Sequence, residues 1–273
     1  MKTILLATDF SRNAKPASDF ALQLAELLQA RLVLLHVYQH PLRLAPLQAV
    51  FTPMEEKNKV NARRRLYRLR DRMKQASGGQ VTITVMARQG STQQTIAAVA
   101  VEQKADLLVM GTAGANSSSV QYFGSQATEM IVRTPVPLLL IPPAARFVAF
   151  KNVVVALDLS QPLEATALDG VLRFADRFNA VLNFLCVSSK GDDLVIQQTA
   201  RSVRNLLRYR AHTLSVIEGD DLAETIRLFT AENRADLVIM LPKEHNRFLF
   251  SILESNTQQI ARQSDVPVLA LVS

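Results

Sequence analysis

Residues 104–114 read KADLLVMGTAG, and residues 234–244 read RADLVIMLPKE, so one apolar segment with its flanks occurs twice at an offset of 130 residues. The offset continues without a gap as far as the VPLLL and VPVLA segments that follow. The opening segments also correspond, because KTILLATDFS at residues 2–11 resembles NVVVALDLS at residues 152–160. Similarity at a nearly constant offset indicates an internal duplication. The chain is therefore predicted to contain two copies of one folding unit.

Within each copy, short apolar segments alternate with longer amphipathic ones, a pattern typical of a parallel sheet covered by helices on both faces. Strands of the first copy are predicted at residues 2–8, 31–38, 81–87, 106–110 and 137–141, and helices at 14–29, 55–76, 91–104 and 123–133. Strands of the second copy are predicted at residues 152–157, 180–187, 212–217, 236–241 and 267–272. The fold class is α/β, with two tandem five-stranded, doubly wound parallel-sheet domains at residues 1–145 and 150–273.

Composition agrees with two compact domains. The chain has 273 residues, of which 48% are hydrophobic and 20% charged, as in globular proteins that bury a core. No apolar run approaches the roughly 18 residues of a membrane span, so we expect no membrane association and a cytoplasmic location. The single cysteine, Cys186, cannot form a disulfide within the chain.

Positive charge is concentrated in one predicted helix. The net charge is +7, and residues 57–74 contain nine Lys or Arg against one acid, Asp71. Val60, Leu66 and Leu69 are spaced so that they can share one apolar face, which favours a helix whose basic side chains face water. The alternative function is an interaction protein that docks acidic partners or nucleic acid through this helix, independently of any nucleotide. Nucleic acid is the weaker partner, because no aromatic stacking platform accompanies the basic residues.

Three of the nine glycines fall within MGTAGANSSSVQYFGS at residues 110–125. Gly111 directly follows the fourth predicted strand, and ligands of open parallel sheets bind beyond the carboxyl ends of the strands. A Gly- and Ser-rich loop before a helix can turn its N–H groups toward a phosphate. Asp9, at the same predicted edge, can accept hydrogen bonds from a ribose or an adenine amine. These features predict a mononucleotide pocket, against the alternative that the glycines only serve surface turns.

The order of ATDFS, HVY, MGTAG and a later GS resembles the universal stress protein superfamily, whose ATP-binding members carry G-x2-G-x9-G-[ST]. The resemblance covers nearly the whole chain as two fused copies, and it implies an adenine nucleotide α hydrolase-like fold. It implies that Asp9 contacts the ribose or base and that the backbone around Val37 receives the adenine. The residues implied to bind the nucleotide are Ala7, Asp9, Val37, Met110, Gly111, Gly114, Gly124 and Ser125.

The resemblance also implies a function. We expect a stress-response protein that binds ATP, with Mg²⁺, in its N-terminal domain and serves as a regulatory nucleotide-binding module for a protein partner that the sequence does not identify. The two copies are expected to form a pseudo-dimer within the chain through their apolar last strands, and a homodimer of chains is a further possibility. No catalytic residue is assigned, so any ATP hydrolysis is expected to be slow.

The second copy departs from the motif. Leu241, Glu244 and Glu254 replace the three motif glycines, and only Ser255 remains. A carboxylate repels phosphate, and any side chain fills the space that a close-approach glycine leaves open. The C-terminal domain is therefore not expected to bind ATP in the same manner.

Several other constellations are absent from the sequence. There is no Walker A loop and no G-x-G-x-x-G after a predicted strand, which argues against a P-loop ATPase and a dinucleotide dehydrogenase. The four histidines are dispersed and lack neighbours at metal-ligand spacing, so no metal site is predicted within the protein.

Overall fold

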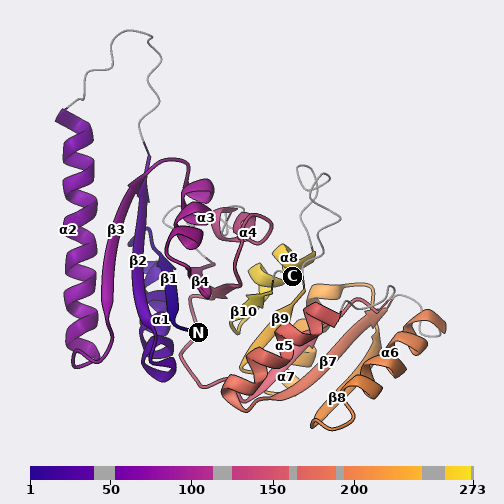
Figure 1. Ribbon diagram of the computed structural model, residues 1–273. Helices are drawn as coiled ribbons and strands as arrows, with labels where there is room; N and C mark the ends of the chain where they lie inside the picture. The colour runs from indigo at the N-terminus through magenta and orange to yellow at the C-terminus, as the bar shows by residue number, and fades with distance from the viewer. Residues whose placement is uncertain (40–52, 113–124, 160–164, 189–193, 242–255, 272–273) are drawn as a thin grey trace, which may run out of the picture. The chain divides into compact units, whose positions relative to one another are not determined.

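The computed structural model describes residues 1–39, 53–112, 125–159, 165–188, 194–241 and 256–271. Its contacts divide the chain into two compact units, Met1–Phe147 and Val148–Ser273. Figure 1 shows that each unit contains strands and helices from one continuous half of the chain. The two units are described separately below.

The first unit is a five-stranded parallel sheet with the order β3-β2-β1-β4-β5. From β1 the chain adds β2 and β3 on one side and then returns to add β4 and β5 on the other side. Because the crossovers are right-handed, α1 and α2 cover one face of the sheet and α3 and α4 cover the other. The strands are β1 (Thr3–Ala7), β2 (Arg31–Tyr38), β3 (Ile83–Gln89), β4 (Leu107–Gly111) and β5 (Leu138–Ile141). The helices are the 3-10 helix η1 (Arg12–Ala14), α1 (Lys15–Leu28), α2 (Pro53–Ala76), α3 (Thr92–Glu102) and α4 (Ser125–Met130).

The second unit repeats this topology. Its strand order, β8-β7-β6-β9-β10, matches that of the first unit position by position, and its neighbouring strands pair in parallel. The strands are β6 (Asn152–Ala156), β7 (Val181–Ser188), β8 (His212–Glu218), β9 (Leu237–Met240) and β10 (Val268–Ala270). The helices are α5 (Ala165–Phe178), α6 (Leu194–Leu206), α7 (Leu222–Glu232) and α8 (Asn256–Gln263). The predicted tandem α/β class is confirmed.

Each unit has its own aromatic core contacts. In the first unit the ring of Phe20 on α1 meets the ring of Phe147 edge-on, with centroids 4.9 Å apart. In the second unit the ring centroid of Phe150 lies 5.7 Å from that of Phe174 and 5.0 Å from that of Phe178. Such clusters bury large apolar areas and gain from offset or edge-on ring geometry.

Helix α2 buries a different face from the one predicted. Leu66 and Leu69 are buried as expected, but Val60 is 53% exposed, and Ala62 and Met73 complete the buried stripe instead. The spacing of Ala62, Leu66, Leu69 and Met73 follows the helical period, whereas Val60, nine residues before Leu69, lies about half a turn away on the opposite side of the helix. The inclusion of Val60 in the apolar face was therefore wrong.

The end of α2 is set by two glycines. Gly78 and Gly79 adopt φ values of 58° and 80°, which side chains disfavour, and the N–H of Gly79 donates to the carbonyl of Lys74 at 2.9 Å. This is a left-handed helix-ending turn. Helix α4 is shorter than predicted, because it ends at Met130, where a turn follows.

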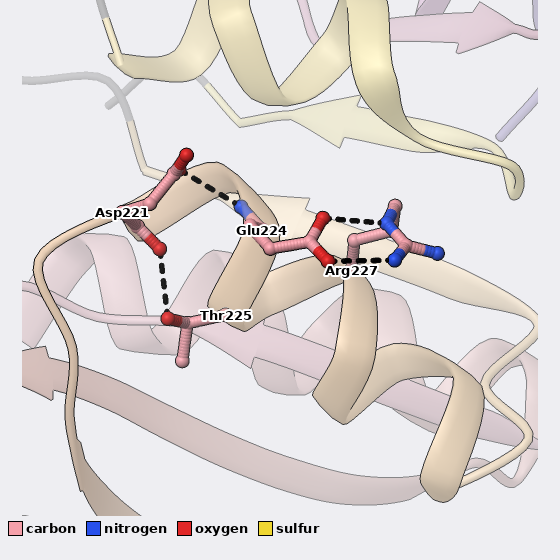
Figure 2. A network of polar contacts seen from close by, with 4 residues as sticks. All are labelled: Asp221, Glu224, Thr225 and Arg227. Carbon is pink, nitrogen blue, oxygen red and sulfur yellow. Dashed lines mark hydrogen bonds and ion pairs between the residues drawn. The ribbon is translucent and has the colours of Figure 1, made fainter.

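The start of α7 carries a polar network that Figure 2 shows in close-up. The carboxylate of Asp221, the N-cap residue, accepts from the N–H of Glu224 at 3.0 Å, and its carbonyl accepts from the hydroxyl of Thr225 at 2.7 Å. The Glu224 carboxylate accepts two hydrogen bonds from the Arg227 guanidinium, both at 2.7 Å. At the matching position of the first unit, Ser91 precedes α3 and makes no capping bond through its side chain. Duplicated helices therefore begin in different ways.

Candidate functional site

The candidate residues at the ends of β1 and β2 lie at one edge of the sheet. Ala7 ends β1 and pairs with Leu35 of β2, and the N–H of the next residue, Thr8, still donates to the Leu35 carbonyl at 2.9 Å. Asp9 and Val37 each come two residues after this pair, so they belong to the same end of adjacent strands. Carboxyl ends of parallel strands form the edge at which open α/β sheets bind ligands.

The end of β4 adjoins the same edge. Leu6 of β1 pairs with Val109 of β4, and Met110 and Gly111 follow directly as the last two residues of that strand. Met110 is buried and pairs with Leu140 of β5, whereas Gly111 is partly exposed. Met110 therefore belongs to the core, and Gly111 lies at the rim.

Gly111 leaves space beside the start of α1. A Cβ built on it would lie 3.4 Å from the carbonyl oxygen of Asn13 and 3.6 Å from atoms of Ala14 and Ala17, which are ordinary contacts. An alanine would therefore fit, but a longer side chain would occupy the space between the end of β4 and the first turn of α1. The equivalent residue of the second unit, Leu241, has such a side chain.

The loop after β1 is held by short-range hydrogen bonds. The exposed carboxylate of Asp9 accepts from the N–H of Ser11 at 2.9 Å, and the hydroxyl of Ser11 accepts from the N–H of Ala14 at 3.1 Å. Ser11, rather than Asp9, is thus the residue that caps the following helix. Between them, Phe10 has a φ of 59°, a conformation that bulky side chains rarely adopt. Such strain is a common feature of ligand-binding loops.

His36 of β2 supports this loop. The dispersed histidines of the sequence were considered only as metal ligands, and this role was not predicted. The Nδ1 of His36 lies 2.7 Å from the carbonyl oxygen of Thr8, so that nitrogen carries the proton and donates. Burial lowers the pKa of His36, the Thr8 hydrogen bond opposes that shift, Arg65 lowers the pKa further and Asp9 raises it. The imidazole is therefore neutral at pH 7. Its ring centroid lies 4.6 Å from that of Phe10.

Arg65 of α2 completes the contacts around Phe10. Its guanidinium carbon lies 4.4 Å from the ring centroid of Phe10, and its Nη2 donates to the Phe10 carbonyl at 3.4 Å. Stacking of this kind orients an arginine by cation–π attraction. The sequence prediction had the basic side chains of this helix facing water, and it did not identify the contact of Arg65 with Phe10.

Part of the predicted set lies outside the described residues. This applies to Gly114 and Gly124, and also to Glu244, Glu254 and Ser255 of the second copy. Ser125 is the first residue of α4, as predicted, but its side chain is not described. The described part of the candidate site consists of Ala7, Asp9, Val37, Met110 and Gly111.

The described residues lack two features that would point to other functions. Within those ranges, no group of three or more His, Cys, Asp or Glu side chains is arranged to hold a metal ion. None of the helices in the described part of the chain has the length and apolar character needed to cross a membrane.

Comparison with known proteins gives a consistent result. The model of the Universal stress protein family matches the chain twice, over residues 1–142 and 149–271. A Thermus aquaticus protein, described as a universal stress protein in the QAH/OAS sulfhydrylase 3' region, is 34% identical over 144 residues, which are 51% of this chain and 98% of that protein.

Solved structures share the fold at low sequence identity. A universal stress protein from Archaeoglobus fulgidus DSM 4304 is 18% identical with a TM-score of 0.75, covering 99% of this chain and 96% of its own. A putative universal stress protein from Pseudomonas aeruginosa UCBPP-PA14 is 16% identical with a TM-score of 0.66, covering 100% of this chain and 93% of its own. These matches extend the shared fold over both copies.

Proposed function

Because the chain belongs to the universal stress protein family and carries two copies of its domain, we propose that the N-terminal domain binds ATP with Mg²⁺ and acts as a regulatory module. One observation carries the proposal. Asp9, Val37 and Gly111 lie at the carboxyl ends of three neighbouring parallel strands, and Gly111 begins the spacing G-x2-G-x9-G-S. A strand-end edge followed by a glycine-rich segment suits a mononucleotide.

Each group has a distinct part in the proposed complex. The exposed Asp9 carboxylate would accept from the ribose hydroxyls or the adenine amine, and the backbone near Val37 would receive the adenine edge. Gly111, Gly114, Gly124 and Ser125 would offer backbone N–H groups, and Ser125 its hydroxyl, to the phosphates. We propose that Mg²⁺ arrives with the nucleotide and is held chiefly by phosphate oxygens and water, as Mg²⁺ commonly is.

The C-terminal domain is assigned a different role. Leu241 fills the space that Gly111 leaves open, and the sequence adds Glu244 and Glu254 where phosphates would lie. We propose that this domain does not bind ATP in the same manner, and that it pairs with the first domain through their last strands as a pseudo-dimer. We also propose that whole chains form a homodimer and that the protein docks a regulatory protein partner. The proposed location is the cytoplasm, where ATP is present.

The proposed activity is binding, and no catalytic residue is assigned. The sequence alone nominates no nucleophile and base pair, and the proposal gives Asp9 the role of accepting hydrogen bonds from the ligand rather than of activating water. We therefore expect bound ATP to be hydrolysed slowly if at all. Release of labelled phosphate from a stoichiometric complex over hours measures this directly.

Calorimetric titration of ATP with Mg²⁺ into nucleotide-stripped protein tests the proposal. The parent is expected to bind about one ATP per chain, and Gly124→Glu and Gly111→Leu, which imitate the second copy, are expected to bind none. The matched control is Gly170→Glu, because a side chain at Gly170 on α5 meets no atom within 4 Å. This control is expected to bind ATP as the parent does.

Two results would refute nucleotide binding at this site. One is a stripped, folded parent that binds no ATP, and the other is undiminished binding in both motif variants. Salt separates the pocket from the alternative of polyanion docking on α2, because counterion release makes docking fall steeply with added salt.

A further inference from the structure

A cavity lies in the N-terminal unit beside the candidate nucleotide residues, because Thr8 and Phe10, which flank Asp9, are among its lining residues. It has a volume of about 510 Å³ and lies between the β1–α1 connection and α2. Ala7, Asp9, Val37, Met110 and Gly111, the described residues of the candidate nucleotide site, are not among its lining residues. Its volume falls within the range of about 300–1,000 Å³ usual for small-molecule sites.

The cavity is lined by five basic residues. Arg65, Arg68 and Arg72 come from α2, and Arg12 and Lys15 come from η1 and the start of α1. Among the described residues that line the cavity there is no aspartate or glutamate. Positive side chains thus approach the same space from two elements, and a cavity lined with one sign of charge concentrates the potential within it.

The α2 arginines share one face of the helix. Positions 65, 68 and 72 are three and four residues apart, which places their side chains on one face. Arg63 and Lys74, on other faces of α2, are exposed and do not line the cavity. Folding therefore divides the exposed basic residues of α2 into a group that borders the cavity and a group on other faces of the helix.

Only part of this positive charge is neutralised by contacts within the protein. Lys15 forms an exposed ion pair with Asp19 at 2.9 Å, and Arg65 is held against the ring and carbonyl of Phe10. Among the described residues, no carboxylate lies within ion-pair distance of Arg68 or Arg72. These two guanidinium groups are thus available to an external anion.

We propose that this cavity binds a small anion that carries two or more adjacent phosphoryl groups. Arginine pairs with phosphate oxygens through two parallel N–H donors, and several arginines match several phosphoryl groups. The volume exceeds what one orthophosphate needs, and cations from both α2 and the η1–α1 segment suit a small ligand between them better than a nucleic acid lying on one helix face. This site does not depend on ATP binding at the strand edge.

Calorimetry with pyrophosphate tests the proposal, using the variant Arg68→Gln/Arg72→Gln. The matched control is Arg63→Gln/Lys74→Gln, which removes the same charge from α2 at exposed positions outside the cavity. Loss of two charge-assisted bonds is expected to weaken pyrophosphate binding at least about tenfold, and the control is expected to change it less than about threefold. Orthophosphate is expected to bind at least about tenfold more weakly than pyrophosphate.

Other outcomes would overturn this assignment. Equal weakening in both double variants would show diffuse attraction to the basic helix, and a folded parent that binds no pyrophosphate would refute the anion site directly. Loss of pyrophosphate binding in Gly124→Glu, with the arginine variant unaffected, would place the anion at the nucleotide motif instead. Tighter binding of a DNA duplex than of pyrophosphate, weakened equally by both double variants, would identify α2 as a nucleic-acid surface.

Discussion

Asp106 and Asp236 make the same two backbone hydrogen bonds in the two halves of the chain. One carboxylate oxygen of Asp106 accepts from the N–H groups of Lys2 and Thr3 at 2.6 and 2.9 Å. One carboxylate oxygen of Asp236 accepts from the N–H groups of Lys151 and Asn152 at 2.8 and 2.9 Å. Each aspartate thus joins the start of its fourth strand to the start of the first strand of its unit.

Removal of the Asp236 carboxylate is expected to destabilise the second unit. Asp236→Ala leaves two backbone N–H groups without their acceptor, and hydrogen bonds to charged groups contribute about 1.5–3 kcal/mol. We expect a loss of about 1.5–3 kcal/mol in the free energy of unfolding, and a smaller loss for Asp236→Asn, which keeps one acceptor oxygen. Urea unfolding followed by circular dichroism measures both. Asp220→Ala, an exposed neighbour of the α7 cap, is the control, and an equal effect there would contradict the prediction.

The two copies offer a matched test of helix capping. Asp221→Ala removes the side-chain acceptor of the Glu224 N–H and is expected to cost about 1 kcal/mol in the free energy of unfolding. Ser91→Ala, at the matching position before α3, is expected to cost less than about 0.5 kcal/mol, because the Ser91 side chain makes no capping bond. The urea unfolding midpoints of the two variants are compared. Equal shifts would show that the side-chain capping bond does not determine the loss of stability.

Titration of His36 is expected to make stability depend on pH. Burial lowers its pKa in the folded protein below the ordinary value of 6.5, so the unfolded chain binds the proton more tightly. The contribution of His36 is therefore fully present above about pH 6.5, and is lost as the pH falls from there through the folded-state pKa. Nitrogen–proton correlation spectra of the imidazole measure that pKa.

Two variants should move the His36 pKa in opposite directions. Arg65→Gln removes a cation that disfavours the imidazolium and is expected to raise the pKa, whereas Asp9→Asn removes a favourable anion and is expected to lower it. A His36 pKa at or above 6.5 in the parent protein would contradict the burial argument.

Several features of the fold follow from local sequence patterns. Five apolar segments of each copy became strands, because continuous apolar runs must be buried on both faces of a parallel sheet. The repeated segment ending at Met110 and Met240 correctly predicted equivalent fourth strands, and the predicted end of the second helix at residue 76 is the observed end of α2. These predictions depended on residues close together in the chain.

Predictions that required a packing partner were less complete. The prediction placed Val60 on the apolar face of α2, but the buried residues of that helix are Ala62, Leu66, Leu69 and Met73. The capping bond before η1 comes from Ser11, a residue to which the sequence prediction gave no role. Burial depends on which neighbouring element lies against a residue, and helical period alone does not contain that information.

The sequence by itself determined the duplication, the parallel α/β class and the asymmetry between a glycine motif in one copy and Leu241, Glu244 and Glu254 in the other. Only the tertiary structure decided which side chains meet. Parallel strands bring Asp9, Val37 and Gly111 to one edge, and helix packing turns Arg65, Arg68 and Arg72 toward the start of α1. The physical reason is that strand order and helix packing join residues far apart in the chain, whereas sequence patterns report only the environment that each segment requires.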